Sequence, residues 1–151
     1  MNEPTSVFRN VQTLMGPVYA GFPSPTEDYA EKSLDLDDLV VSHPVSTYYM
    51  RVVGDSMIGA CIYPNDVIVV DRALTAANNR LVVARLGEQL TLKRLQIVKP
   101  KRIFLKSENP AYPPLEVKRS DDFEIWGVVT WVVHALVSSR PHGDGDGRAA
   151  I

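Results

Sequence analysis

The chain of 151 residues has little sulfur and little histidine: one cysteine, Cys61, and three histidines, His43, His134 and His142. A single cysteine excludes an internal disulfide and a multi-cysteine metal site. The histidines are scattered, which argues against a histidine-based zinc site. We therefore expect neither a metal ion nor a cofactor. We expect Cys61 to be a small buried residue rather than a nucleophile.

The chain also lacks an excess of positive charge and a long apolar run. Sixteen Lys and Arg residues face 18 Asp and Glu residues, a net charge of −2. This balance argues against tight, sequence-specific DNA binding by the chain alone. The longest apolar stretch, residues 128–137, is about half of the roughly 20 residues that cross a bilayer. No basic segment followed by an apolar run opens the chain, so we expect a cytoplasmic protein without a membrane anchor.

Composition divides the chain into three segments. Residues 1–23 carry three prolines, two glycines and scattered apolar residues, which predicts an extended N-terminal arm. Residues 24–137 hold the apolar segments and predict one folded domain. Residues 138–151 contain Gly-Asp-Gly-Asp-Gly and predict a disordered tail.

The folded segment reads as mainly β. Residues 24–27 (Ser-Pro-Thr-Glu) form a capping box that predicts a short helix to about Lys32, and residues 35–40 predict one more helical turn. Runs rich in Val, Ile, Leu and aromatic residues then predict strands at 48–53, 67–71, 81–86, 89–95, 102–106 and 123–136. Gly87-Glu88 predicts a tight hairpin. Many short strands with little helix indicate a mainly β domain.

Ser56 is the candidate nucleophile. It lies in Gly54-Asp55-Ser56, just after a predicted strand, where glycine permits a sharp turn. Such a turn can present the hydroxyl outward, while the backbone N–H groups of Ser56 and Asp55 stabilise a developing oxyanion. Gly-Asp-Ser turns also occur widely without any catalytic role, so these residues alone leave the function open.

Lys93 is the candidate base. No histidine has a setting that suits this role; His134 falls in an apolar segment typical of a hydrogen-bonded structural histidine. Strand alternation places Lys93 on one face with Thr91, Leu95 and Ile97, where apolar neighbours would lower its pKa. A neutral lysine amine can accept the proton of a serine hydroxyl. The alternative is a lysine at a sheet edge whose amine reaches into solvent.

Together these segments resemble the LexA/UmuD family of self-cleaving Ser-Lys peptidases. The likeness rests on residues 54–57 (Gly-Asp-Ser-Met), 66–71 (Asp-Val-Ile-Val-Val-Asp), 92–95 (Leu-Lys-Arg-Leu), 21–25 with 28–29, and 123–133. The resemblance implies a LexA/signal-peptidase-like β domain of short twisted sheets with an extended arm. About 20 residues precede residue 21, fewer than a helix-turn-helix domain needs, which favours the UmuD-type SOS mutagenesis branch.

The resemblance assigns a role to each motif. It implies that Ser56 is the nucleophile, that Lys93 is the general base, and that the scissile bond is Ala20-Gly21. It further implies a homodimer, cleavage stimulated by a RecA–single-stranded DNA filament, and a shortened product that serves a Y-family polymerase in translesion synthesis.

Three alternatives remain from the residues alone. The chain could be a non-catalytic β-rich dimerisation or regulatory module in which Ser56 and Lys93 are structural. It could be a fragment of a prophage-type repressor. A signal-peptidase-like processing enzyme would use the same pair of residues but needs a membrane anchor.

Overall fold

The structure is a computed structural model that describes residues 12–14, 18, 20–22 and 32–137. Contacts divide the chain into two compact units, Met1–Ser42 and His43–Ile151, which are described separately. The predicted tail and nearly all of the predicted helix at 24–32 lie outside the described residues. Within the described part of the chain, no helix has the length and apolar character that crossing a membrane requires.

The first unit contains one small antiparallel pair and one short helix. Strand β1 (Gln12–Leu14) pairs with β2 (Lys32–Leu34), so Lys32 begins a strand and does not end a helix as predicted. Helix α1 (Leu36–Val40) confirms the helical turn predicted at 35–40. Asp35 caps it, because its side chain accepts a hydrogen bond of 2.9 Å from the Asp37 N–H.

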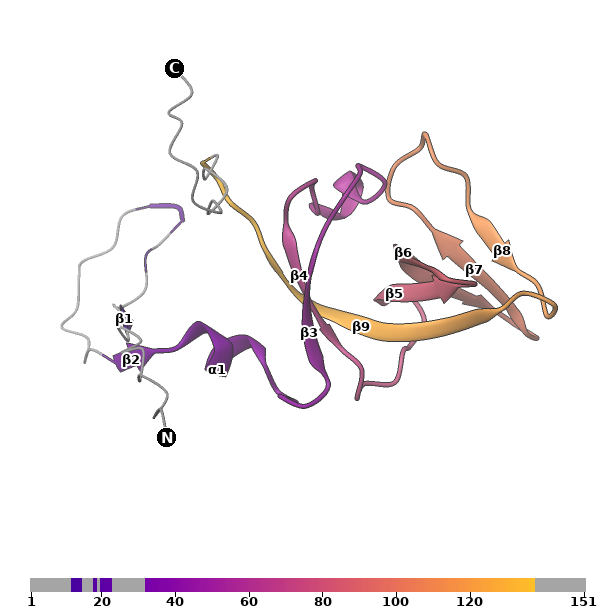
Figure 1. Ribbon diagram of the computed structural model, residues 1–151. Coiled ribbons are helices and arrows are strands. Elements are labelled where there is room, and N and C mark those ends of the chain that lie inside the picture. Colours follow the sequence, from indigo (N-terminus) through magenta and orange to yellow (C-terminus); the bar gives the residue numbers. More distant parts are fainter. Residues whose placement is uncertain (1–11, 15–17, 19, 23–31, 138–151) are drawn as a thin grey trace, which may run out of the picture. The chain divides into compact units, whose positions relative to one another are not determined.

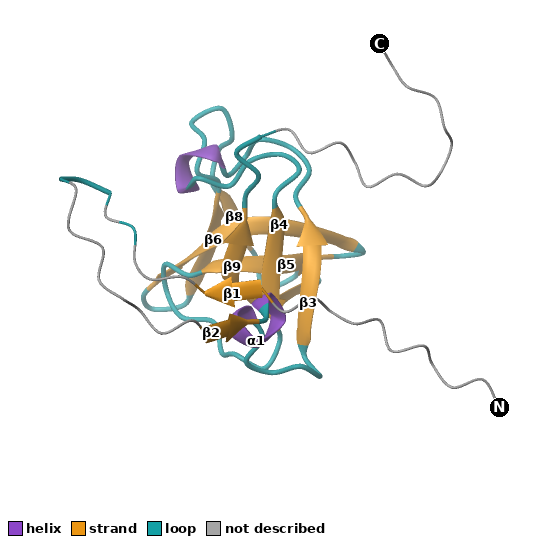
Figure 2. Ribbon diagram, turned by 90° about the vertical axis from the view of Figure 1, so that its left-hand side faces the viewer, coloured by secondary structure: helices purple, strands orange, loops and turns teal. Residues whose placement is uncertain are grey.

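The second unit is built on one antiparallel sheet of seven strands, which confirms the mainly β prediction. The strands are β3 (Thr47–Arg51), β4 (Val67–Asp71), β5 (Leu81–Leu86), β6 (Gln89–Val98), β7 (Arg102–Lys106), β8 (Leu115–Val117) and β9 (Phe123–Val133). Their order across the sheet is β3-β4-β9-β5-β6-β7-β8, with β3 at one edge beside β4 (Figure 2). A single 3-10 turn, η1 (Ile58–Ala60), follows β3.

Strand bounds follow the sequence pattern closely, with four differences. Strand β3 spans Thr47–Arg51 and ends two residues before the predicted range 48–53 does. The ranges 67–71, 81–86 and 102–106 are strands as predicted. Strand β6 runs three residues further than predicted because β7 folds back on it, with Val98 opposite Arg102. Strand β9 ends at Val133 rather than at residue 136. The short β8 was not predicted, because Pro113 and Pro114 directly before it indicate a turn.

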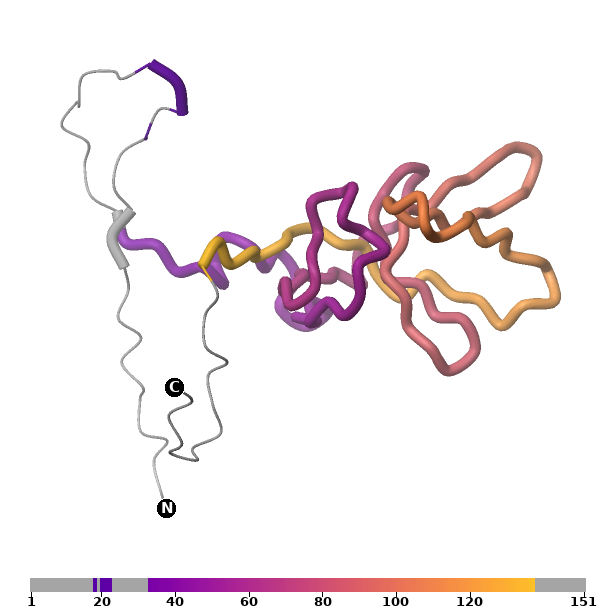
Figure 3. The backbone as a smooth tube through the Cα atoms, turned by 90° about the horizontal axis from the view of Figure 1, so that it is seen from above, coloured from indigo at the N-terminus to yellow at the C-terminus, as the bar shows by residue number. Residues whose placement is uncertain are grey.

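The long strand β9 joins the two halves of the sheet. Its first half pairs with β5 and its second half with β4, so Val128 faces both Val82 and Asp71. Figure 1 shows β9 crossing this unit from β5 to β4, and Figure 3 shows the same path from above. Register shifts interrupt both pairings, and such bulges let a strand bend.

Two apolar clusters form the core, and β5 contributes to both. Alternating side chains of a strand point to opposite faces, so Val83 enters one cluster while Val82 and Ala84 enter the other. The first cluster is made of Val52, Met57, Ile62, Ile68, Val70 and Val83; the second is made of Val82, Ala84, Leu95 and Leu105. The first cluster includes residues on both sides of Ser56 in the chain, and it anchors the loop that carries this serine.

Candidate active site

Ser56 lies in the loop between β3 and β4, a few residues after β3 ends. Gly54 adopts a φ of +86°, the left-handed conformation that glycine accepts readily. This confirms the sharp turn predicted there. The next side chain, Met57, is 2% exposed and packs in the first apolar cluster. Burial of Met57 holds the loop down, while Ser56 remains half-buried at the surface.

The structure brings Ser56 and Lys93 into contact. The Lys93 Nζ lies 3.1 Å from the Ser56 Oγ and 3.0 Å from the Leu92 carbonyl oxygen, to both of which it donates. Strand β6 has β5 on one side and β7 on the other. Lys93 itself pairs with Val82 of β5, and the pairing with β7 begins one residue later, at Arg94. Its amine contacts the Ser56 hydroxyl, 37 positions away in the sequence, and does not extend freely into solvent.

Burial of the Lys93 amine lowers its pKa below the ordinary value of 10.5. Desolvation is the cause, because a partly dry site disfavours the charged form. Among the described residues, no carboxylate lies within ion-pair distance of this amine. The neutral amine, which can accept a proton, is therefore more populated than in an exposed lysine.

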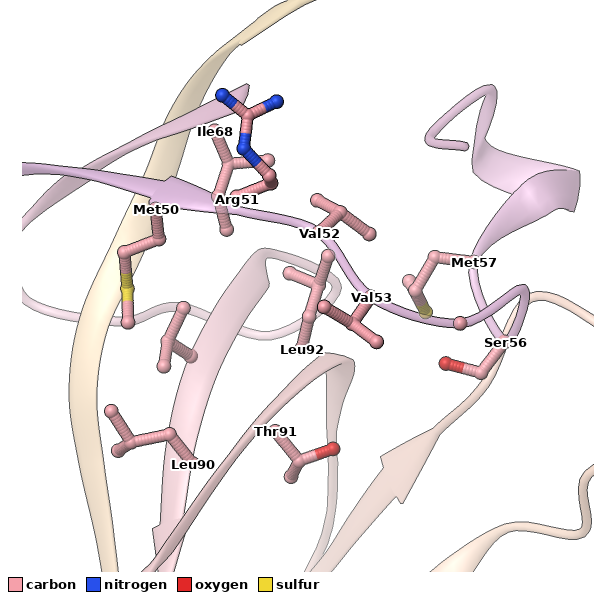
Figure 4. A pocket seen from close by; sticks show the side chains of 12 residues that line it. Met50, Arg51, Val52, Val53, Ser56, Met57, Ile68, Leu90, Thr91 and Leu92 are labelled. Carbon is pink, nitrogen blue, oxygen red and sulfur yellow. The ribbon is translucent and has the colours of Figure 1, made fainter. Parts of the chain in front are cut away.

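A pocket of about 280 Å³ opens beside Ser56. Most of its lining residues have apolar side chains, and they come from the end of β3 and the loop after it, from β4 and β5, and from the start of β6. Its lining residues are Met50, Arg51, Val52, Val53, Gly54, Ser56, Met57, Ile68, Val83, Leu90, Thr91 and Leu92. Figure 4 shows the Ser56 hydroxyl pointing from its loop toward this space. Such walls suit uncharged side chains of an extended peptide.

The backbone N–H groups of Asp55 and Ser56 have no acceptor among the described residues. The carbonyl groups of the same two residues are occupied: Asp55 accepts from the Ile58 N–H at 3.4 Å, and Ser56 accepts from the Glu108 N–H at 2.9 Å. The two N–H donors thus remain available next to the hydroxyl. Their role in an oxyanion hole stays a prediction.

Residues 108–112 form a loop, here called the 108–112 loop, that is hydrogen-bonded to the Ser56 loop. Besides the Glu108 contact, the Asn109 side-chain amide donates to the Asp55 carbonyl at 3.0 Å. The Tyr112 hydroxyl donates to the Asp55 carboxylate at 2.6 Å, and this bond raises the Tyr112 pKa. These contacts could not be predicted from the sequence, because Asn109-Pro110 indicates a turn but not which residues the turn contacts.

The described histidines are held elsewhere. His43 Nδ1 lies 2.5 Å from an Asp71 carboxylate oxygen, and His134 Nδ1 lies 2.5 Å from an Asp66 carboxylate oxygen. This confirms His134 as a hydrogen-bonded structural residue. It lies just beyond the end of β9. Within the described residues, no group of three or more His, Cys, Asp or Glu side chains could hold a metal ion.

The exposure of Cys61 and of the predicted cleavage site can also be compared with the predictions. Cys61 is exposed, so the expectation that it is buried is wrong. The chain turns at Cys61 with a φ of 58° to end η1, and Met57 and Ile62 fill the core in its place. Ala20 and Gly21, in the first unit, are exposed, and no described atom lies within 4 Å of where a Gly21 side chain would begin.

Comparison with known proteins places this chain in a family. Residues 13–130 match the family model described as Peptidase S24-like. Protein SamA of Salmonella typhimurium is 42% identical over 80% of this chain and 82% of its own length, and Protein MucA of Escherichia coli is 41% identical over 80% of each. The LexA repressor of Bordetella parapertussis is 37% identical over 82% of this chain but 56% of the repressor. The chain therefore belongs to the peptidase S24-like family of self-cleaving serine peptidases, beside the UmuD-like mutagenesis proteins SamA and MucA.

Proposed function

We propose that this chain is a self-cleaving Ser-Lys peptidase of SOS mutagenesis that hydrolyses its own Ala20-Gly21 bond. The observation that carries the proposal is the 3.1 Å contact between the Lys93 Nζ and the Ser56 Oγ. When Lys93 is charged, its Nζ donates a hydrogen bond to the Ser56 Oγ. When Lys93 is neutral, the same distance allows its Nζ to accept the proton of the Ser56 hydroxyl.

The reaction follows from these two groups. Lys93 takes the proton of Ser56 as the hydroxyl oxygen attacks the Ala20 carbonyl carbon, and the backbone N–H groups of Ser56 and Asp55 stabilise the oxyanion. The bond to the Gly21 nitrogen then breaks, and Lys93 gives its proton to the leaving amine. Water attacks the resulting ester, with its proton passing through Lys93 back to Ser56. The products are a free carboxylate on Ala20 and a free amino group on Gly21.

The substrate segment suits the pocket and its tether. Ala20 and Gly21 have the smallest side chains, so an extended segment that carries them can enter a narrow site beside Ser56. In the sequence, Ser56 is 36 positions after Ala20. At about 3.3 Å per extended residue, this length allows cleavage within one chain or in a partner copy. Presentation within one molecule makes the rate independent of dilution.

The proposed partners of this chain are those that its family implies. A RecA–single-stranded DNA filament stimulates the cleavage in the cytoplasm, and the shortened chain forms a homodimer that assists a Y-family polymerase in translesion synthesis. The relatives SamA and MucA support this assignment, because the chain matches about four fifths of each. The net charge of −2 supports action through proteins rather than through a grip on DNA.

The test is the intact mass of the purified chain after incubation at about pH 10, where more of the amine is neutral than at pH 7. We expect loss of residues 1–20 from the wild type and from Lys101→Ala, an exposed lysine on the turn between β6 and β7. Neither Ser56→Ala nor Lys93→Ala should cleave. A wild-type chain that stays intact for days would contradict the proposal and favour a non-catalytic dimerisation module.

A further inference from the structure

We propose that Glu108 is a positioning residue of this peptidase: paired with Arg94, it holds the Ser56 loop where the hydroxyl reaches Lys93. The inference rests on the proposed function and adds a residue to its machinery. Glu108 touches neither the substrate bond nor the Lys93 amine; it acts through the loop.

The backbone of Glu108 grips the Ser56 loop at two points. Its N–H donates to the Ser56 carbonyl at 2.9 Å, and its carbonyl accepts from the Gly59 N–H at 2.7 Å. These two bonds bracket the segment from Ser56 to Gly59. A displacement of Glu108 therefore moves the nucleophile itself and not a distant part of the loop.

The side chain of Glu108 ties this grip to the strand that carries the base. Its carboxylate accepts a hydrogen bond from the Arg94 Nε, and Arg94 follows Lys93 directly in β6. Arg94 is itself fixed, because its Nη1 donates to the Asn79 carbonyl at 2.7 Å. The side chains of Arg94 and Glu108 are 31% and 29% exposed, and such partly buried charged pairs hold their geometry better than exposed ones.

The two loops lie in close backbone contact at Gly59, with no space for a side chain between them. A side-chain carbon built on Gly59 would lie 2.5 Å from the Glu108 carbonyl oxygen, closer than atoms of this kind approach. The two backbones are therefore pressed together at this point. Glu108 sets how near the Ser56 loop comes to β6, and so it sets the distance between hydroxyl and amine.

A loosened loop has two separate consequences. The hydroxyl leaves the reach of the amine, which slows cleavage at every pH. Water also reaches Lys93, whose pKa then rises toward the ordinary lysine value, because desolvation is what lowers it. A residue that merely stabilised the fold would change neither the plateau of the pH–rate profile nor its midpoint in the folded protein.

The experiment measures self-cleavage of Glu108→Ala, Glu108→Gln and Arg94→Lys against pH, at a temperature where circular dichroism shows each variant folded. We expect the plateau rate to fall about tenfold or more in Glu108→Ala and the profile midpoint to move to higher pH. Glu108→Gln keeps an acceptor and should lie between Glu108→Ala and the wild type. If Glu108→Ala does not fold, the plateau and midpoint of the pH–rate profiles of Glu108→Gln and Arg94→Lys test the proposal instead.

Glu116→Ala is the matched control. Glu116 makes the same kind of pair, with Arg102 Nε at 2.7 Å, on β7 and β8 outside the site. We expect an unchanged rate and midpoint in this variant. The charge-reversed double variant Arg94→Glu with Glu108→Arg should recover part of the rate lost in either single reversal.

The outcomes separate the two proposals. A wild-type chain that does not cleave would overturn both. A cleaving wild type with Glu108 and Arg94 variants of unchanged plateau and midpoint would overturn the role of Glu108 alone. An equal loss in Glu116→Ala would also overturn it, because any ion pair of the sheet would then matter as much.

Discussion

A basic side chain lies at each end of β4 and in the middle of β6, but the partners of these side chains differ. At the ends of β4, His43 and His134 contact Asp71 and Asp66, whose carboxylates are 3% and 4% exposed. In β6, Lys93 contacts a hydroxyl and a carbonyl group. A carboxylate stabilises a protonated base, whereas a neutral hydroxyl does not. The fold thus keeps its buried carboxylates away from the amine that we propose as the general base.

Both described histidines are engaged away from Ser56, although histidine is the usual partner of a nucleophilic serine. Each described histidine is committed to an aspartate that also binds the backbone: Asp66 accepts from the Tyr63 N–H and Asp71 from the Ala73 N–H, both at 2.8 Å. These pairs fix the chain where it enters and leaves β4. The residue in contact with Ser56 is a lysine made less basic by burial alone.

The pH dependence of cleavage is the largest effect that the comparison predicts. The rate should rise about tenfold per pH unit while Lys93 is mostly charged, and the midpoint of the profile should lie below pH 10.5, because burial lowers the Lys93 pKa from that value. The fraction cleaved, measured by mass against time between about pH 6 and pH 10, gives the profile. A profile that stays flat from one end of this range to the other would remove a titrating lysine from the mechanism.

Adding a carboxylate beside Lys93 should give the amine the kind of partner that His43 and His134 have, and so should raise its pKa. Thr91 lies two residues before Lys93 on the same face of β6 and lines the pocket. In Thr91→Asp the new charge stabilises the charged amine, and a rise of about one pKa unit slows cleavage about tenfold below the plateau. The pH–rate profile measures this shift.

Thr91→Asn is the control for that variant, because it has nearly the same shape as the aspartate without its charge. It should keep the wild-type midpoint. Equal midpoints in Thr91→Asp and Thr91→Asn would show that charge at this position does not reach the amine.

Removal of Asp71 should affect stability and leave cleavage nearly unchanged. Asp71→Ala leaves the Ala73 N–H, the Ser46 hydroxyl and His43 without their acceptor, at a cost of about 1–3 kcal/mol in the free energy of unfolding. Urea denaturation measures this cost. The variant should still cleave when folded; a loss of cleavage without a loss of stability would contradict the division between the two regions.

Asp71 should also make the free energy of unfolding decrease in acid. Hydrogen bonds from His43, the Ala73 N–H and Ser46 hold the Asp71 pKa below its ordinary value, although its desolvation acts in the opposite direction. The folded state thus binds this proton less well than the unfolded state does. The contribution of Asp71 is complete above its ordinary pKa and is lost as the pH falls through the lowered folded value. Urea denaturation from pH 7 to pH 3 should show a smaller decline in Asp71→Asn than in the wild type.

The smallest effects are expected at the histidines. Each of the variants His43→Ala and His134→Ala loses one hydrogen bond to a carboxylate that still accepts from a backbone N–H. Because both histidines are more than one-third exposed, we expect the free energy of unfolding to fall by about 1 kcal/mol. Cleavage rates should stay within about twofold of the wild type. A tenfold loss in one of these variants, while it is folded, would give that histidine a part in the reaction.

The regular strands could be read from the sequence because each is a run of apolar and β-branched residues between clear turn signals. The bounds of β4, β5 and β7 match their predicted ranges for this reason. The end of β9 could not be predicted, since Leu136 and Val137 continue the apolar pattern after the strand has ended. A contact between His134 and Asp66, distant in sequence, lies just after the end of this strand.

At the site, the two reactive residue types were visible in the sequence, but their support was not. Gly54-Asp55-Ser56 and the face of Lys93 are local patterns that strand periodicity can place. The contacts of Glu108 with Ser56, Gly59 and Arg94 join three segments of the chain, and no local pattern encodes them. Cys61 shows the same limit, because its exposure depends on a left-handed turn that its residue type does not favour.

Strand β9 also has a consequence for the order in which the site is completed during synthesis. In the sheet, β3 and β4 carry the serine loop, β5 to β8 carry the lysine, and β9 lies between these two groups. A nascent chain that still lacks residues 123–133 therefore has its two reactive groups on strands that no ladder connects. Among the described strands, β9 is the last to be synthesised and it completes the sheet. We therefore expect the self-cleavage proposed above to begin only after residues 123–133 have been made.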